Sequence, residues 1–177
     1  MNHKRTSLSA EKLLGRGQVL PHLQRSIAKA QQSILIVGPW LDAYFVGKII
    51  NSLADAKIDV HFIVRIDGDE QIDSKTLSAL NLAREKIPEF QAKTLQNLHS
   101  KVIIIDREVF YLGSTNWYWY SLHESLELTV TGKTSFLPEI ITEMDNYWEN
   151  ATPLNSENLK GYRDYEPITT DIHLKFL

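Results

Sequence analysis

Apolar residues recur along the chain at two spacings, which predict alternating strands and helices. SILIVG (33–38) and IDVHFIVR (58–65) are apolar runs of strand length. Between them AYFVGKIINSLADA (43–56) has apolar residues at helical spacing, and Asp42 stands where it can cap that helix. Strand, helix and strand joined by short links form a right-handed crossover unit, so we expect this half of the chain to be parallel sheet with helices packed on it.

The rest of the chain continues this alternation. PHLQRSIAKAQQ (21–32) is expected to form a helix before the first strand. SKTLSALNLAREKI (74–87) is expected to form a helix capped by Asp73 or Ser74, and Pro88 marks its end. Four further strand candidates and a late amphipathic helix follow: EFQAKTL (89–95), HSKVIIID (99–106), EVFYLG (108–113), SLELTVTG (125–132) and SFLPEIITEMDNYWEN (135–150).

This order of elements predicts an α/β fold with one mixed, largely parallel β-sheet flanked by helices on both faces. We interpret residues 1–177 as a single domain with its core at about residues 20–150. The tail after Pro153 (153–177) mixes polar and aromatic residues without a clear period, and we expect it to pack loosely or to be partly disordered.

Composition narrows the class of protein. With 43% hydrophobic and 23% charged residues, the chain is typical of a globular protein, and its net charge of -3 argues against wrapping by nucleic acid through charge alone. The net charge of the whole chain does not reveal whether a local basic groove is present. The absence of cysteine excludes disulfides, thiol nucleophiles and zinc–thiolate sites. No secretory signal and no apolar run of membrane-spanning length is present, so we expect a cytoplasmic protein without stable membrane association.

Polar side chains stand at the entrance and the exit of an apolar strand pair. In the candidate strand 99–106, His99 and Lys101 are two residues apart and should share one face, whereas Asp106 should lie on the opposite face. Ser114 and Asn116 follow the next strand, are again two residues apart and should also share a face. Such groups are costly to desolvate, so their placement indicates a site.

A further acidic residue belongs to this set. Glu127 lies between Leu126 and Leu128 in a candidate strand, and a carboxylate between two core leucines needs a partner. The imidazole of His99 is the obvious candidate.

These residues resemble the HxK-x4-D and GSxN signature of the phospholipase D superfamily. The matching positions are His99, Lys101, Asp106, Gly113, Ser114 and Asn116. Glu127 lies where that family places the acid that orients its histidine, and the resemblance covers about residues 20–150. Each residue alone has an ordinary interpretation, such as a snorkelling lysine or a polar turn residue. The occurrence of all of these residues together, at fixed spacings, favours a phosphodiester site. In that site Asp106 and Gly113 have structural roles.

The resemblance implies a mechanism that needs neither metal nor cofactor. His99 is expected to attack phosphorus and form a phosphohistidine, while Lys101, Ser114 and Asn116 bind the phosphate. Two histidines are needed and the chain has one such motif, so the resemblance implies a homodimer with a shared active site. The short single-motif members of the family are mostly endonucleases, so DNA or RNA is the expected substrate.

Three alternatives remain open from the sequence. The chain could be a phospholipase D-type lipid phosphodiesterase, or a non-catalytic nucleic-acid-binding module of the same fold. It could also be a metal-dependent hydrolase with His99, Asp106 and Glu127 as ligands, although Asp106 should face away from His99. A nuclease needs local basic residues near its cleft, for which Lys93, Lys101 and Arg107 are candidates.

The remaining histidines and aromatic residues are interpreted without a catalytic role. The five histidines outside the motif have no matching pattern around them: His3, His22, His61, His123 and His173. The aromatic cluster NWYWY (116–120) favours core and interface packing over a base-stacking platform, although stacking stays possible.

Overall fold

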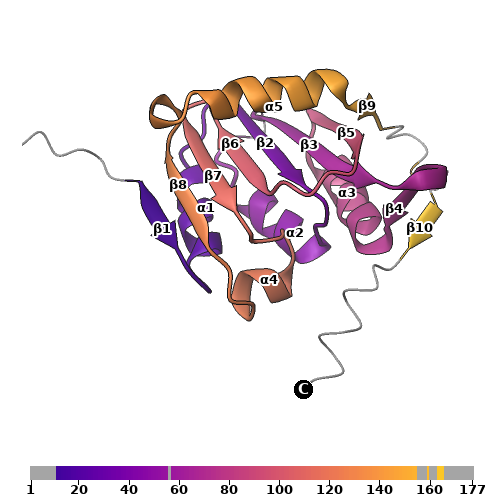
Figure 1. Cartoon of the computed structure of the whole chain (residues 1–177), viewed down its shortest axis with the longest axis horizontal. Coiled ribbons are helices and arrows are strands. Elements are labelled where there is room, and N and C mark those ends of the chain that lie inside the picture. Colours follow the sequence, from indigo (N-terminus) through magenta and orange to yellow (C-terminus); the bar gives the residue numbers. More distant parts are fainter. Residues whose placement is uncertain (1–10, 56, 155–158, 160–162, 166–177) are drawn as a thin grey trace, which may run out of the picture.

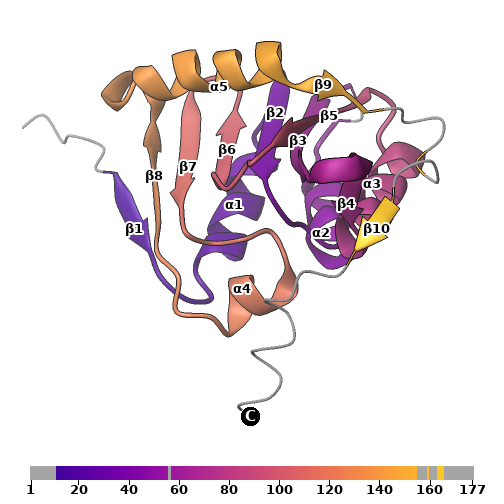
Figure 2. The same ribbon diagram turned by 45° about the vertical axis from the view of Figure 1, so that its right-hand side comes forward.

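The computed structural model describes residues 11–55, 57–154, 159 and 163–165. Within these residues, an eight-stranded mixed sheet carries helices on both faces (Figures 1 and 2). In spatial order its strands are β1 (Lys12–Leu14), β8 (Thr129–Lys133), β7 (Val109–Gly113), β6 (Val102–Ile105), β2 (Ser33–Gly38), β3 (Asp59–Ile66), β5 (Phe90–Gln96) and β9 (Thr152–Pro153). A small second sheet pairs β4 (Gln71–Asp73) with β10 (Arg163–Tyr165).

The helices divide between the two faces of the large sheet, as the predicted fold class requires. Helices α1, α2 and α3 pack on one face, and α5 crosses the other face (Figures 1 and 2). Their bounds are α1 (Val19–Ile27), α2 (Ala43–Ser52), α3 (Ser74–Lys86), the short α4 (Trp119–His123) and α5 (Glu139–Asn150). Two 3₁₀ turns, η1 (Gly68–Glu70) and η2 (Thr134–Phe136), complete the set. None of the helices in the described ranges is long and apolar enough to cross a membrane.

The parallel part of the sheet is confirmed. Strand β2 pairs parallel with β3, and β3 pairs parallel with β5, whereas the ladders β2–β6, β6–β7, β7–β8, β1–β8 and β5–β9 are antiparallel. In β6 alternate residues enter the two cores: Ile103 and Ile105 face α1–α3, and Val102 and Ile104 face α5. Burial on both faces explains why this strand reads as an unbroken apolar run.

Two predicted helix caps are confirmed. Asp42 accepts a hydrogen bond from the main-chain N–H of Phe45 (2.8 Å) at the start of α2, and Asp73 accepts one from that of Thr76 (2.9 Å) in α3. Helix α2 is shorter than the predicted range 43–56, since it ends at Ser52, whereas α3 matches its predicted range within one residue.

One edge of the sheet collects the chain segments that carry the signature. The register pairs Val37 of β2 with Val102 at the start of β6, and Gly113 at the end of β7 with Thr129 at the start of β8. The β5–β6 loop, the β7–α4 connection and the start of α2 therefore lie at the same end of the sheet, together with α4 (Figure 1).

The structure corrects two strand predictions and qualifies the one for the tail. Strand β6 begins at Val102 and not at residue 99, and β8 begins at Thr129 and not at residue 125. The described part of the tail is packed, because Leu154 and Leu159 are buried and residues 163–165 pair with β4. The rest of the predicted tail lies outside the described residues.

Candidate active site

His99 and Lys101 lie in the irregular segment between β5 and β6, where their side chains meet. The Lys101 Nζ is 3.0 Å from Nδ1 and 3.3 Å from Nε2 of the His99 ring, and it donates to the His99 carbonyl oxygen at 2.7 Å. Lys101 is only 5% exposed, whereas His99 is exposed. The two residues were predicted to meet because they alternate along a strand, but a loop brings them together.

The electrostatics of this pair favour an uncharged imidazole. Partial burial, followed by the positive charges of Lys101 and Arg65, lowers the pKa of His99 below its ordinary value of 6.5. Burial also lowers the pKa of Lys101, while the charge of Glu127 acts in the opposite direction. A neutral ring keeps a nitrogen lone pair for attack on phosphorus.

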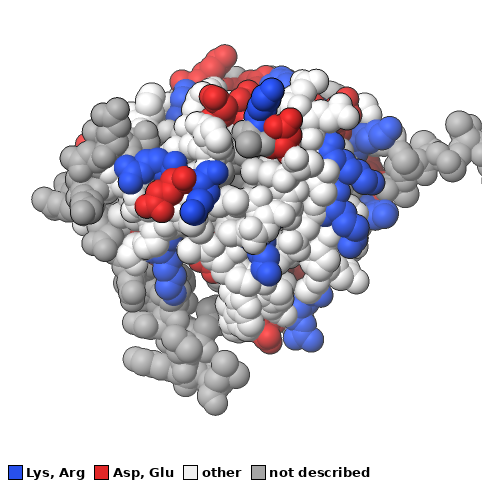
Figure 3. All heavy atoms as spheres, turned by 180° about the vertical axis from the view of Figure 1, so that it is seen from behind, with Lys and Arg blue, Asp and Glu red and all other residues white. Residues whose placement is uncertain are grey.

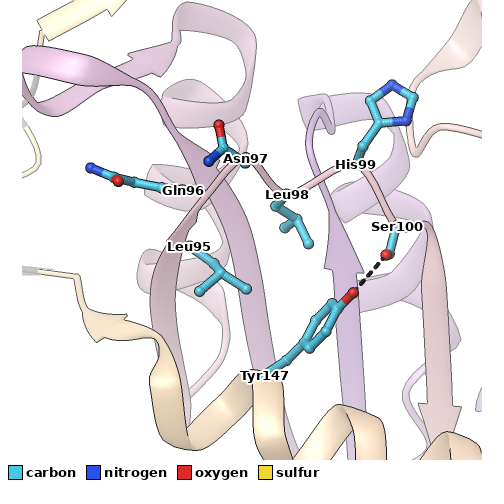
Figure 4. A pocket seen from close by; sticks show the side chains of 7 residues that line it. All are labelled: Leu95, Gln96, Asn97, Leu98, His99, Ser100 and Tyr147. Carbon is cyan, nitrogen blue, oxygen red and sulfur yellow. Dashed lines mark hydrogen bonds between the residues drawn. The ribbon is translucent and has the colours of Figure 1, made fainter.

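The imidazole stands at the rim of a hollow of about 510 Å³. The hollow is lined by Leu95, Gln96, Asn97, Leu98, His99, Ser100 and Tyr147. Figure 4 shows the His99 ring projecting away from Leu98 and Tyr147, on the far side of the loop. The Ser100 hydroxyl bonds the Tyr147 hydroxyl at 3.0 Å, which ties the loop to α5, and Trp40 makes an edge-on contact with the His99 ring (5.8 Å between centroids). The loop is therefore braced on both sides.

The expected partnership of Glu127 with His99 is not found within one chain. Leu126 is 87% exposed and Leu128 is 58% exposed, so Glu127 does not lie between core leucines. Among the hydrogen bonds of the described residues, the Glu127 carboxylate accepts from three serine hydroxyls: those of Ser114, Ser121 (3.1 Å) and Ser125 (2.9 Å). Glu127 lies in an irregular segment, so the strand alternation used for the prediction does not apply.

Gly113, the last residue of β7, and Ser114 contact the irregular segment that contains Glu127. The Ser114 hydroxyl also accepts from the main-chain N–H of Leu128 (3.2 Å). A Cβ at Gly113 would lie 2.2 Å from the Leu128 carbonyl oxygen and 2.6 Å from the Thr129 Cα, so a larger residue would force the backbone apart. The glycine of the signature therefore allows the close approach that places Ser114 on Glu127.

Asn116 contributes a polar group that the chain leaves unsatisfied. Its main-chain N–H donates to Ser121 Oγ (2.9 Å), and its side chain bonds the hydroxyl of Tyr118. Burial raises the pKa of Tyr118, and this hydrogen bond offsets part of that shift. The buried Asn116 Oδ1 has no hydrogen-bond partner among the described residues. Leaving such an atom unpaired is costly, and because an amide oxygen accepts hydrogen bonds, a donor group from a bound ligand or a second chain would relieve that cost.

Asp106 has a structural position at the far end of β6. Its carboxylate accepts from the main-chain N–H groups of Gln31 (2.9 Å), Gln32 (2.8 Å) and Ser33 (3.0 Å). Burial alone would raise the pKa of Asp106, but these three hydrogen bonds lower it overall. Since this carboxylate is bonded away from His99, the three residues considered as metal ligands do not converge. No cluster of three His, Asp or Glu side chains suited to a metal occurs in the described ranges.

Two predicted groove residues lie elsewhere. Lys93 donates to the Trp148 carbonyl oxygen (2.7 Å) and lies over that indole ring, and Arg107 forms a paired contact with Asp145 (2.7 and 2.8 Å). Both side chains are engaged with α5, so neither joins Lys101 in a basic groove.

Sequence reasoning missed Arg65 and Trp40. Arg65 ends the apolar run of β3 and forms a salt bridge with Asp67 (2.7 Å), and Trp40 follows β2. The signal was available, because sites gather at the carboxyl ends of parallel strands.

The other histidines of the described residues have local partners. His22 Nδ1 bonds the Tyr111 hydroxyl (2.8 Å), and His61 stacks on Trp148 (4.9 Å between centroids). His123 ends α4 and contacts both Tyr44 and Trp119. His3 and His173 lie outside the described residues.

Replacing Lys101 with methionine tests the electrostatic description. The substitution removes the ammonium group and keeps a side chain of similar length. The pKa of His99 should therefore rise toward its ordinary value. NMR titration of the imidazole signals measures this directly. Lys93→Met is the matched control and should leave His99 unchanged, and a His99 pKa that stayed the same or fell in Lys101→Met would contradict the description.

The chain is similar to a known protein family in sequence and to solved structures in fold. Residues 23–151 match the protein family described as "Cardiolipin synthase, PLD-like domain". No curated protein matches the chain. Among solved structures, the chain is similar to NucT from Helicobacter pylori (TM-score 0.67, 20% identity) and to the phospholipase D family member Nuc from Salmonella typhimurium (TM-score 0.65, 18% identity). Each alignment covers 82% of this chain and 99% of the other.

The fold is also similar to a longer protein. Phosphatidylserine synthase from Haemophilus influenzae aligns with a TM-score of 0.64 and 14% identity, over 95% of this chain and 46% of the synthase. At these identities, the structural likenesses establish the fold alone.

Proposed function

The chain belongs to the phospholipase D superfamily, and on that premise we propose that it is a metal-independent nuclease that acts as a homodimer. The observation that carries the proposal is the His99–Lys101 pair. An imidazole with a lowered pKa stands against a buried ammonium, at the same edge of the sheet as Ser114 and Asn116. This arrangement supplies a nucleophile together with groups that bind a phosphate.

The proposed reaction proceeds in two displacements. A neutral His99 ring attacks phosphorus, so an N–P bond forms as the P–O bond to the leaving group breaks. The departing alkoxide takes a proton from the His99 ring of the second chain. Water then attacks the phosphohistidine and gives a proton to that second ring, which releases the first imidazole. Lys101 and Asn116 stabilise the charge on the non-bridging oxygens, and Glu127 fixes Ser114 and balances the charge of Lys101.

The need for a second histidine is matched by an exposed apolar surface beside the site. We call it the apolar edge surface, and it consists of Leu13, Leu112, Leu126, Leu128 and Val130. Val130 of β8 pairs with Leu13 of β1 on one side and with Leu112 of β7 on the other, so these three side chains share one face of the sheet. Leu126 and Leu128, which flank Glu127 in the sequence just before β8, are also exposed. Exposed apolar patches of this kind mark interfaces, and a two-fold axis here would bring two copies of the site together.

Nucleic acid is favoured over lipid as the substrate. This chain corresponds in length to nearly the whole of NucT and Nuc but to less than half of phosphatidylserine synthase. On the face seen in Figure 3, Lys and Arg occur in scattered groups with Asp and Glu among them, around a wide area without charge. Together with the net charge of -3, this favours binding of a polymer through local groups near the site.

Incubating the purified protein with four substrates, each without and with EDTA, tests the proposal. The substrates are single-stranded DNA, RNA, bis(p-nitrophenyl) phosphate and phospholipid vesicles. We expect cleavage of at least one of the two polymers and no product from lipid. Product from lipid alone would favour the phospholipase alternative, loss of activity on adding EDTA would favour a metal-dependent enzyme, and binding of polymer without cleavage would favour a binding module.

A further inference from the structure

Three aromatic side chains form a connected cluster at the same edge of the sheet as His99. The cluster consists of Tyr44 from α2 with Trp119 and His123 from α4. The His123 Nε2 and the Tyr44 hydroxyl are 3.1 Å apart, and the two rings meet edge-on with their centroids 5.6 Å apart. The His123 ring also packs against the indole of Trp119, at 5.2 Å between centroids.

Trp119 is exposed and yet held in place. It is 45% exposed, which leaves much of the indole open to solvent beyond its contact with His123. Its main-chain N–H donates to Asp42 Oδ2 (2.8 Å), and the other oxygen of that carboxylate caps α2 through the N–H of Phe45 (2.8 Å). This hydrogen bond fixes the main chain at Trp119, and the contact with the His123 ring restrains the indole itself, so the side chain loses little conformational entropy when a flat ligand stacks on it.

A positive charge accompanies the cluster. The Lys48 Nζ lies 5.2 Å from the centroid of the Tyr44 ring. A shallow hollow of about 330 Å³ borders Tyr44 and includes Lys75 and Ser74 among its lining residues. Aromatic rings next to lysines are the combination that proteins use to bind single-stranded nucleic acid, with rings for the bases and cations for the backbone.

The cluster is linked to the β5–β6 loop, which carries His99, through residues 40–42. Trp40 contacts the His99 ring, and the Trp40 carbonyl accepts from the N–H of Trp117 (3.3 Å). The Trp117 carbonyl in turn accepts from the N–H of Asp42 (3.0 Å), which also holds Trp119. Trp40 and Asp42 are two residues apart, and two residues of extended chain span about 7 Å at most. The backbone that supports the cluster therefore lies no farther from His99 than the length of a few nucleotides.

From this arrangement we propose that Tyr44, Trp119 and His123 form a stacking platform for an unpaired nucleobase that flanks the scissile phosphate. The proposal rests on the proposed nuclease function and refines it by naming the substrate class, single-stranded nucleic acid. A base within a duplex is covered on both faces by its neighbours, so it cannot stack on Trp119 until it is unpaired. The platform therefore selects single strands over duplexes.

The test compares binding of normal and abasic oligonucleotides by protein with the wild-type platform and by platform variants, all of which also carry His99→Ala so that the oligonucleotide is not cleaved. Fluorescence anisotropy gives Kd for a single-stranded deoxyoligonucleotide and for a series with one abasic residue at successive positions. For the protein with the wild-type platform, one or two abasic positions should raise Kd about tenfold. Trp119→Ala should raise Kd for the normal oligonucleotide by a similar factor, and the abasic residue should then have no further effect. Trp119→Phe should recover part of the affinity.

Phe136→Ala is the matched control. Phe136 is 44% exposed, close to the value for Trp119, but lies in η2 at the opposite end of β8 from α4. It should leave Kd unchanged. If the abasic penalty persists in Trp119→Ala, or if that variant binds the normal oligonucleotide as the wild type does, the platform is refuted.

Because binding is measured without turnover, the two proposals fail separately. If the wild-type protein cleaves no substrate but an abasic residue still weakens binding, the nuclease proposal is rejected and the stacking platform is retained. If the wild-type protein cleaves nucleic acid but abasic residues do not affect binding, the nuclease proposal is retained and the platform is rejected.

Discussion

Replacing His99 with alanine is expected to lower the rate of phosphodiester hydrolysis by at least about 10³-fold. The imidazole is the group that forms the bond to phosphorus, and its copy in the second chain protonates the leaving group, so the substitution removes two roles from each shared site. Lys101 and Asn116 can still bind a phosphate, so the variant should keep much of its affinity for the substrate.

Steady-state hydrolysis of bis(p-nitrophenyl) phosphate and of single-stranded DNA measures this loss. His61→Gln is the matched control, because His61 stacks on Trp148 near the start of β3 and away from the site edge. It should keep the wild-type rate. Wild-type protein quenched during turnover should carry acid-labile phosphate on histidine, and His99→Ala should carry none. An alanine variant that turned over at the wild-type rate would rule out His99 as the nucleophile.

Replacing Leu128 with aspartate is expected to break the homodimer and to abolish activity together with it. Leu128 lies in the apolar edge surface, next to Glu127, and is 58% exposed in the single chain. In the folded monomer the new carboxylate is solvated and costs little. At an apolar interface it must be desolvated, and we expect the dissociation constant of the dimer to rise at least about 100-fold.

Analytical ultracentrifugation and activity assays over a range of protein concentrations check this prediction. Phe136→Asp places the same charge on an exposed apolar position outside the apolar edge surface, and it should leave both dimer and activity intact. Thermal melting shows whether Leu128→Asp stays folded. A fully active monomer would exclude a shared site, and an intact dimer would place the interface elsewhere.

Local physical chemistry made much of the fold predictable from the sequence. The apolar run at 33–38 coincides with β2, and the carboxylates of Asp42 and Asp73 cap α2 and α3 as predicted. Each of these features depends on neighbours in the chain. Strands β1, β9 and β10 are two or three residues long and exist because of distant pairing partners, so no local pattern could reveal them.

In the candidate site, too, features set by sequence neighbours were predictable and features set by distant residues were not. The signature placed His99 and Lys101 together, but strand alternation was the wrong reason, since β6 begins only at Val102. The leucines around Glu127 were interpreted as core because they are apolar, and the structure exposes them. Apolar character does not distinguish a side chain buried in its own chain from one available to a second copy. The contribution of Arg65 to the His99 pKa depends on β3 and the β5–β6 loop meeting in space.

The most direct test of the account uses a heterodimer with one wild-type chain and one His99→Ala chain. The two chains are given different affinity tags, and the mixed species is isolated by successive purification on both. A shared site holds a single imidazole in this heterodimer, so its hydrolysis of single-stranded DNA should fall below about one-hundredth of the wild-type rate. A heterodimer that keeps half of the wild-type activity would show that each chain acts alone, and would contradict the account.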